Sequence, residues 1–259
     1  MERFFFDENN VLLVAALEYA GFLLRYLLIA GGAYLVFYIW QQKRFASIRI
    51  QPKFPEKNMI RMEILYSLST FAIFSCSGLF IFWLEGEGLT QLYFDIKEYG
   101  VTWLVVSVSL MMLMHDTWFY WSHRFMHLKS VFPYVHKVHH LSINPTPMAS
   151  FSFHPVEAVI EAAIFPILVV SLPLHPLAIV IFLFLMTVMN VVGHLGYEIL
   201  PKGFTKHWFF KWSNTSTHHN MHHRLVKCNY GLYFNFWDRV MGTNHKQYDE
   251  HFEEVKSRS

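Results

Sequence analysis

The chain has 259 residues, of which 54% are hydrophobic and 18% aromatic, and its mean hydropathy is +0.27. This composition indicates a membrane protein, and a net charge of +2 gives no reason to expect nucleic-acid binding. Two cysteines, Cys76 and Cys228, are too few for a disulfide framework or a cysteine-ligated metal site.

Two long apolar runs near the N-terminus predict helices that cross the membrane. Residues 12–40 contain only Glu18 and Arg25 as charged residues, and residues 64–84 contain none. Each run is long enough to cross a bilayer core about 30 Å thick. The N-terminus lacks the basic start, short apolar stretch and cleavage site of a secretory signal, so we expect the first segment to remain as an anchor.

Three further apolar runs follow, at residues 101–114, 159–170 and 174–192. The last two are separated by Pro173 and Pro176, which predicts a helical hairpin. The alternative is a set of buried core helices in a soluble protein, and the lengths of the runs favour the membrane. The predicted fold is therefore an all-α integral membrane protein with about four transmembrane helices in two hairpins.

The charges of the loops predict the orientation of these helices. The loop after the first span is mainly basic and the loop after the second is mainly acidic, so the positive-inside rule places the first loop in the cytoplasm. The third span and the hairpin then each return the chain to that side. The residues concerned are Lys43, Arg44, Arg49, Lys53, Lys57 and Arg61 with Glu56 and Glu63, and then Glu85, Glu87, Asp95 and Glu98 with Lys97.

No internal repeat is evident, so we expect membrane anchor helices and loops over residues 1–100, a catalytic domain over 101–247, and a charged tail over 248–259 that frays. Residues 43–62 are the predicted linker. Residues 203–212 mix lysines with aromatic residues, which suits either an interfacial helix among lipid headgroups or an amphipathic core helix.

Eight histidines fall into three tight clusters. Imidazole is the commonest metal ligand in proteins, and residues three or four apart share one face of a helix, so each cluster can direct its nitrogens at one point. The pattern predicts a metal site, with two ions. The clusters are His123 with His127, then His136, His139 and His140, and finally His219, His222 and His223.

Other residues near the clusters are candidates for supporting roles. Asp116 and Tyr120 lie on one helical stripe with the first cluster, so we expect them to orient its imidazoles. His194 follows the hairpin and is a candidate ligand, His218 is either an extra ligand or a supporting donor, and His154 is expected to stabilise the site together with Glu157. The remaining histidines show no such pattern; they are His115, His175, His207, His245 and His251.

The number of imidazoles bears on the identity of the metal. Structural zinc takes four ligands and catalytic zinc takes three and a water, so eight or nine histidines exceed one zinc ion. Two ions with four or five nitrogens each suit iron in a site for oxidation. Imidazole also suits zinc, which could occupy the site in the isolated protein.

These motifs resemble those of the fatty acid hydroxylase and sterol desaturase superfamily of integral membrane diiron oxidases. The resemblance covers residues 115–243 and rests on DTWFYWSHRFMH, HKVHHLS, SFHPVE, GHLGYE, HHNMHH followed by NYG, and WDRVMGT. It implies a four-helix membrane base with a cytoplasmic cap, which carries two iron ions. The ligands implied by the motifs are His123, His127, His136, His139, His140, His194, His219, His222 and His223.

One departure from the family pattern concerns the residue four after His194. Some acyl hydroxylases have a second histidine there, whereas this chain has Glu198, which favours the sterol desaturase branch. An all-imidazole shell is neutral, so we expect Asp116, Glu157 and Glu198 to offset the charge of the ions through histidine N–H groups.

The resemblance implies O₂-dependent hydroxylation or desaturation of a C–H bond in a sterol-like or acyl lipid, in the bacterial inner membrane or the endoplasmic reticulum. Neither a fused cytochrome b5 motif nor a flavin fingerprint is present, since the His-Pro pairs are followed by Val156 and Leu177. An external electron donor is therefore implied, a cytochrome b5-like or ferredoxin-like protein with its reductase. We expect it to dock on a basic face formed by Lys129, Lys137, Lys202 and Lys206.

Two alternatives remain open. A zinc-dependent lipid hydrolase could use the same scaffold, because zinc activates water. A metal-binding or transport membrane protein would also be rich in histidine, but its ligands should lie at the bilayer midplane, and here they lie beyond the spans.

Overall fold

The computed structural model describes residues 10–258, and in that range it is helical, with no β-structure beyond three isolated bridges. The predicted all-α fold is confirmed. The prediction about a secretory signal concerns residues 1–9, which lie outside the described part. The helices are α1 (Val11–Tyr26), α2 (Gly32–Tyr34), α3 (Lys57–Gly86), α4 (Gly100–Met126), α5 (Phe132–Val135), α6 (Lys137–His140), α7 (Pro155–Ala162), α8 (Ile164–Ser171), α9 (Pro176–Gly193), α10 (Ser216–Leu225), α11 (Phe236–Val240) and α12 (Tyr248–Lys256).

Four helices of the described chain are long and apolar enough to cross a membrane, which confirms the predicted number. They are α3, α4, α9 and a continuous helix over Val11–Trp40, in which α1 continues through π-helical turns and α2. Helix α9 has 18 residues, or about 27 Å at 1.5 Å per residue. The chain is therefore an integral membrane protein by length and composition.

The first arm of the predicted hairpin differs from the expectation. Residues 159–170 do not form one helix, because the chain bends at Ala163 between α7 and α8, which have eight residues each. Pro166 lies in the first turn of α8, where its missing N–H cannot bond to the carbonyl of Ala162. The proline therefore ends one helix and fits the start of the next. Helix α9 completes the hairpin.

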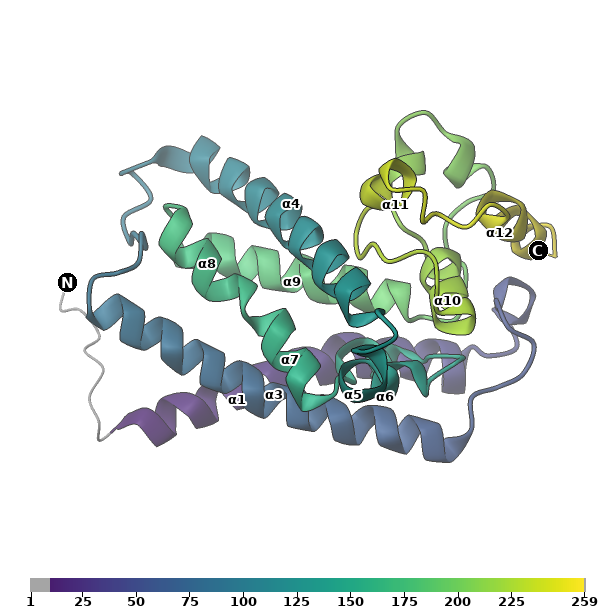
Figure 1. Cartoon of the computed structure of the whole chain (residues 1–259), viewed down its shortest axis with the longest axis horizontal. Helices are drawn as coiled ribbons and strands as arrows, with labels where there is room; N and C mark the ends of the chain where they lie inside the picture. Colours follow the sequence, from purple (N-terminus) through teal and green to yellow (C-terminus); the bar gives the residue numbers. More distant parts are fainter. Residues whose placement is uncertain (1–9, 259) are drawn as a thin grey trace.

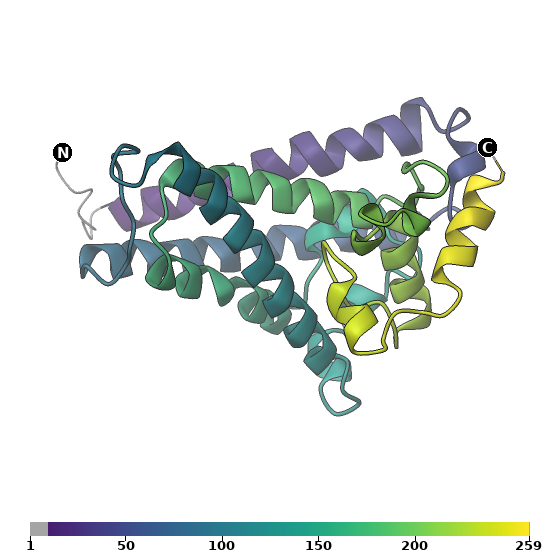
Figure 2. The same ribbon diagram turned by 90° about the horizontal axis from the view of Figure 1, so that it is seen from above.

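The long helices run roughly along the long axis of the molecule in alternating directions (Figure 1). Helix α1 leads away from the end that carries the N-terminus, α3 returns to it, and α4 leads away again; α7 with α8 and then α9 repeat this movement (Figures 1 and 2). The segments that contain the histidine clusters all lie at the end opposite the N-terminus. The predicted common end for the clusters is confirmed.

The core of the bundle fixes the loop beneath the histidines. The hydroxyl of Tyr26 on α1 donates to the Met148 carbonyl over 2.9 Å, and the hydroxyl of Ser67 on α3 donates to the same oxygen over 3.1 Å. Phe71 and Phe151 pack edge to face with ring centroids 5.7 Å apart. Two transmembrane helices thereby hold residues 147–151, which lead directly into Ser152, whose carbonyl accepts a hydrogen bond from His139.

The linker is shorter than predicted. Helix α3 begins at Lys57, so the connection from the first span ends before the predicted boundary at residue 62. The loop also contacts the chain that follows α9, since the Ile50 N–H donates to the Gly196 carbonyl over 3.0 Å and the Glu198 N–H donates to the Ile48 carbonyl over 2.8 Å. It is therefore a docked loop rather than a free linker.

The segment 203–212 is not a helix, so both helical expectations for it are wrong. It contains two 3₁₀ turns, Phe204–Lys206 and Phe210–Trp212, separated by residues 207–209, of which His207 is extended. The His207 ring accepts hydrogen bonds from the N–H groups of Phe209 and Phe210, which stops the first turn from continuing as a helix. Trp208 is 75% exposed, and Phe209, Phe210 and Trp212 are also exposed, whereas Phe204 packs against a hydrophobic core.

The C-terminal tail does not fray within the described residues. It forms α12, whose residues Tyr248, Phe252 and Val255 are fully buried. Tyr248 and Phe252 pack with Met221 of α10 in a second small hydrophobic core. The reason is the spacing of these three residues, which places them on one face of a helix. We call residues 199–258, which contain α10 to α12, the cap.

Candidate metal centre

The structure brings the nine predicted histidine ligands together in two neighbouring groups. Within each group the ring nitrogens that could bind an ion lie within 4.8 Å of one another. The rings of His140 and His223, from different groups, have centroids 5.1 Å apart, so the two groups are adjacent. The first group is His123, His127, His136, His140 and His222, and the second is His139, His194, His219 and His223.

The distances between the nitrogens fit metal coordination. In the first group the Nε2 atom of His123 lies 2.9 Å from that of His136 and 3.3 Å from that of His127. In the second, the Nε2 atoms of His219 and His194 are 3.0 Å apart. Nitrogens about 2.1 Å from one ion lie about 3.0 Å apart at a right angle and about 3.4 Å apart at the tetrahedral angle. The groups therefore have the spacing of a coordination shell.

The other ring nitrogen of several histidines is held by a backbone carbonyl. The Nδ1–H of His123 donates to the Tyr230 carbonyl over 2.8 Å, and that of His222 donates to the Cys228 carbonyl over 2.6 Å. His139 and His194 donate in the same way to the carbonyls of Ser152 and Asn190, over 3.2 and 2.9 Å. An imidazole that carries its proton on Nδ1 presents a lone pair on Nε2.

These lone pairs face one another across the centre. The Nε2 atom of His222 is buried and has no hydrogen-bond partner among the described residues. Buried lone pairs without a partner are unfavourable, and a cation between them removes the repulsion. The residues present therefore fit a bound metal ion in each group.

Glu157 supports His136 through a buried hydrogen bond. The Nδ1–H of His136 donates to Glu157 Oε1 over 2.7 Å, and both side chains are almost completely buried. Burial raises the pKa of the Glu157 carboxyl and lowers the pKa of His136. Among the described residues, Glu157 is the one carboxylate with a hydrogen bond to a histidine of either group. It lies where the sequence predicted a supporting residue.

Burial keeps the histidines of the centre neutral. It lowers the pKa of His139 to about 4 and that of His194 to about 3, and it holds the pKa values of His219 and His223 well below the ordinary range. Neighbouring imidazoles lower the pKa values of His194, His219 and His223 further, because one charged ring disfavours another. Neutral imidazole is the form that binds metals.

Two of the three sequence clusters are divided between the groups. His136 and His140 belong to the first group, whereas His139 belongs to the second; similarly, His222 belongs to the first while His219 and His223 belong to the second. The expectation that each cluster directs its nitrogens at one point is therefore wrong for these two. Consecutive helical residues differ by about 100° in direction, so neighbours in a cluster point to different groups.

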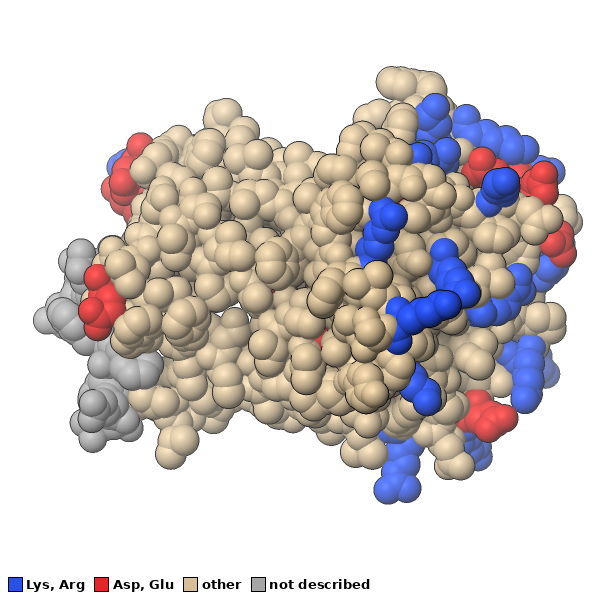
Figure 3. Space-filling view, viewed as in Figure 1, with Lys and Arg blue, Asp and Glu red and all other residues tan. Residues whose placement is uncertain are grey.

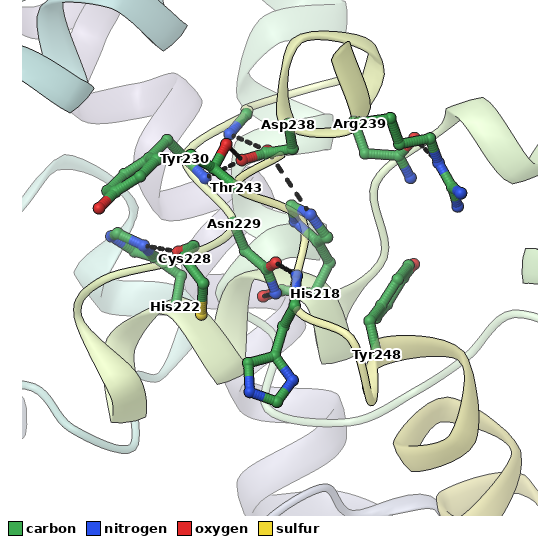
Figure 4. Close-up of polar contacts among 12 residues, drawn as sticks. His218, His222, Cys228, Asn229, Tyr230, Asp238, Arg239, Thr243 and Tyr248 are labelled. Atoms are coloured by element: carbon green, nitrogen blue, oxygen red, sulfur yellow. Dashed lines mark hydrogen bonds and ion pairs between the residues drawn. The ribbon is translucent and has the colours of Figure 1, made fainter. Parts of the chain in front are cut away.

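Asp238, which the sequence patterns did not single out, organises the loop that carries two of the acceptor carbonyls (Figure 4). Its carboxylate accepts from the N–H groups of Tyr230 and Gly231, over 2.8 and 2.7 Å, and from the Thr243 hydroxyl over 2.7 Å. A side chain at Gly231 would overlap this carboxylate and the backbone of Phe234. The signal was available in NYG and WDRVMGT, whose polar residues meet at this point.

Asp116 and Tyr120 do not contact the clustered histidines in the described chain, contrary to our expectation. Asp116 accepts from the backbone N–H groups of Tyr233 and Phe234, over 2.8 and 3.2 Å. The Tyr120 hydroxyl bonds to the hydroxyl of Thr243 over 2.9 Å. Asp116 therefore fastens α4 to the segment that precedes α11, and Tyr120 fastens it to the segment that follows α11. They support the centre through the backbone.

The other proposed supporting residues also act on the backbone. Glu198 accepts from the N–H and hydroxyl of Thr217, over 2.9 and 2.7 Å, and so fixes the first turn of α10. His154 caps α7 by accepting from the Val156 N–H over 3.3 Å. The expectations that Glu198 receives an imidazole N–H and that His154 stabilises the centre directly do not match these contacts.

His218 lies outside both groups. Its ring is completely buried between the ring of Tyr248, with centroids 5.0 Å apart, and the Asp238 carboxylate, whose Oδ2 is 3.6 Å from Nε2 (Figure 4). Burial lowers its pKa to about 4. Of the two roles considered for His218, its position favours that of a supporting residue.

Comparison with known proteins gives the family. The family model described as "Fatty acid hydroxylase" matches residues 108–243, more than half of the chain. The chain belongs to the fatty acid hydroxylase family. All nine histidines of the two groups lie in the matched region. No solved structure gave a significant match.

Several curated proteins are related to this fatty acid hydroxylase family member over most of its length. A Delta(7)-sterol 5(6)-desaturase of Gibberella zeae is 33% identical over 226 residues, which cover 87% of this chain and 67% of the relative. Lathosterol oxidase of Rattus norvegicus is 31% identical, covering 82% and 71%, and lathosterol oxidase of Homo sapiens is 32% identical, covering 72% and 62%. The chain thus spans about two thirds of the length of these relatives.

Proposed function

We propose that this protein is a membrane oxidoreductase that hydroxylates or desaturates a C–H bond of a lipid, using O₂ and two iron ions. The observation that carries the proposal is the pair of adjacent imidazole groups, with five and four nitrogens, in a member of the fatty acid hydroxylase family. Two iron ions bound there would supply the redox chemistry with O₂ that removes hydrogen from an unactivated carbon. The names of the relatives favour a sterol-like lipid.

In this proposal the nine histidines are the metal ligands. Glu157 and the carbonyls of Tyr230 and Cys228 orient the first group, and those of Ser152 and Asn190 orient the second. Such outer contacts fix the tautomer and direction of a ligand, and their loss usually weakens metal binding. The proposed catalytic domain is residues 101–247, with residues 1–100 as the anchor and 248–259 as the tail.

Aromatic side chains close the centre on the side of the bundle. The ring of Phe119 packs against His123 with centroids 4.9 Å apart, and the ring of Phe153 packs against His139 at 5.4 Å. Both phenylalanines are buried. They exclude water from the space where a lipid carbon would have to approach, which protects a reactive centre from side reactions.

The orientation and the electron donor are also proposed. Lysines and arginines gather at the end of the molecule that carries the cap, with several acidic residues among them, whereas the few charged residues visible at the opposite end are mainly acidic (Figure 3). By the positive-inside rule, this distribution of charge supports a metal centre at the cytoplasmic face. The exposed residues Lys129, Lys137, Lys202 and Lys206 would attract an acidic electron-transfer protein.

The test combines metal analysis with mass spectrometry of lipids from cells that express the protein. We expect iron in the purified chain, and a lipid product that differs from its precursor by one oxygen or two hydrogens and forms only with O₂. His222→Ala should abolish the product, whereas His251→Ala, outside both groups, should not. Product formation without O₂ would refute the oxidase and favour a zinc-dependent hydrolase.

A further inference from the structure

A large apolar cavity lies in the half of the bundle away from the histidines. It has a volume of about 790 Å³ and lies between α1, α3, α4, α8 and α9, where Phe22, Phe74, Met111, Phe165 and Phe182 line it. This is the size of a pocket for a small molecule or a lipid. Met111 precedes His123 on α4 by twelve residues, about 18 Å along the helix. None of the nine histidines of the two groups lines the cavity, so it is separate from the metal centre.

The carboxyl group of a residue in the first span forms part of the otherwise apolar wall of this cavity. Glu18 lines the cavity, and its Oε2 atom is buried without a hydrogen-bond partner among residues 10–258. A buried oxygen without a donor is unfavourable, which is a reason to expect that a ligand supplies the donor. Within the described chain, this oxygen therefore makes no hydrogen bond that would stabilise the fold.

Gly78 makes the room for this carboxyl group. A Cβ atom at position 78 would overlap the carboxyl of Glu18, whereas nothing lies within 4 Å of a Cβ atom at Gly21, Gly31 or Gly32 of the first span. One turn further along α1, Phe22 packs against Phe74 of α3 with ring centroids 5.7 Å apart, and this contact fixes the position of α1 along α3. Helices α1 and α3 therefore hold the carboxyl group in a fixed position at the cavity wall.

The lining restricts the chemistry of the ligand. It contains Glu18, Glu85 and Asp95 but no lysine, arginine or histidine, so a phosphate or carboxylate headgroup has no partner there. An ammonium group would need several kcal/mol of desolvation to enter an apolar cavity. A hydroxyl group is neutral and supplies the donor that Glu18 lacks.

We propose that this cavity binds a neutral lipid through its hydroxyl group, with Glu18 as the hydrogen-bond acceptor and the apolar body of the lipid between α3, α4, α8 and α9. This site does not depend on the metal centre or on the reaction proposed for it.

The test uses a photoreactive probe, a diazirine-bearing analogue of 1-octadecanol, and the purified full-length protein in phosphatidylcholine nanodiscs. After irradiation, peptide mass spectrometry should place the label on α3, α4, α8 or α9 beside the cavity. Unlabelled 1-octadecanol should compete at least tenfold better than octadecyl methyl ether or octadecylamine. Equal competition by the alcohol and the ether, stronger competition by the amine, or a label confined to the histidine end would overturn the proposal.

Substitutions on α1 and α3 test the role of Glu18. Glu18→Leu should reduce labelling about tenfold, equivalent to about 1.4 kcal/mol, and Gly78→Ala should do the same because it displaces the carboxyl group. Glu18→Gln keeps the volume and an acceptor and should retain most labelling. Gly21→Ala is the matched control, since nothing lies within 4 Å of a side chain there. Full labelling of Glu18→Leu would overturn the proposal, and if that variant does not fold, the competition with the wild-type protein decides.

Discussion

The hydrogen bond between Glu157 and His136 gives a quantitative prediction about the metal centre. Glu157→Ala removes the acceptor of the His136 Nδ1–H, which is 2.7 Å away in a fully buried pair. The ring then loses the contact that fixes its tautomer and direction. We expect weaker binding of the ion in the five-histidine group and unchanged binding in the four-histidine group.

The size of the effect follows from the contact. A hydrogen bond to a charged group contributes about 1.5–3 kcal/mol, which corresponds to roughly tenfold to a hundredfold in affinity. Loss of an outer contact of a metal-bound histidine typically has an effect of about this size. Glu157→Gln keeps an oxygen acceptor but loses the charge. We therefore expect its loss of metal affinity near the lower limit of this range, and that of Glu157→Ala near the upper limit.

The assay is competition with a chromogenic chelator, followed by elemental analysis of the purified protein. Glu161→Gln is the control, because Glu161 is also buried, lies one turn further on α7, and accepts from the Ser122 hydroxyl over 3.3 Å rather than from a histidine. Wild-type affinity in Glu157→Ala, or an equal loss in Glu161→Gln, would refute the reasoning.

Three further predictions use the same preparation. His139→Ala and His222→Ala each remove a ligand from a different group, so each should abolish activity and lower the bound metal to about half; full metal retention in both, by elemental analysis, would contradict the assignment. Asp238→Ala should weaken metal binding about tenfold, because it releases the loop whose carbonyls hold two ligands; chelator competition showing no change would count against this. Finally, the pKa of His218 is lowered to about 4 in the folded protein, so the unfolded chain binds a proton first as the pH falls below about 6.5. The melting temperature of the metal-free protein should therefore fall between pH 7 and pH 5, and less so in His218→Gln; identical pH dependence in the variant would show that His218 does not contribute.

Much of the fold could be predicted from local pattern. Runs of apolar residues identify the spans because the bilayer requires a minimum length of apolar helix. The errors occurred where a local feature overrides composition: Pro166 divides the first arm of the hairpin, and the His207 ring interrupts the segment 203–212. The prediction that the tail frays is wrong because the tail has only three large apolar residues that pack inward, Tyr248, Phe252 and Val255, but all three lie on one face of a helix.

The sequence predicts which histidines form the candidate site, but not how they divide between its two groups. Eight of the nine histidines stand in clusters with helical spacing, the motif around His194 supplies the ninth, and counting the membrane crossings predicts that all lie at one end. Which group His139 or His140 joins depends on the direction of each ring, and that direction is set by partners distant in the chain. The carbonyl of Ser152 is such a partner for His139, as the carbonyl of Tyr230 is for His123, and a backbone carbonyl has no signature in the sequence.

The sequence by itself determined the class of this protein: an all-helical membrane protein with eight clustered histidines, and His194 as a ninth candidate, at one end of its spans. Only the tertiary structure decided that the histidines divide into five and four, that Glu157 alone among the proposed acids bonds to one of them, and that Glu18 meets Gly78 at the wall of a cavity. The physical reason is that spacing along a helix fixes which residues share a face, whereas the packing of separate helices fixes what each face meets.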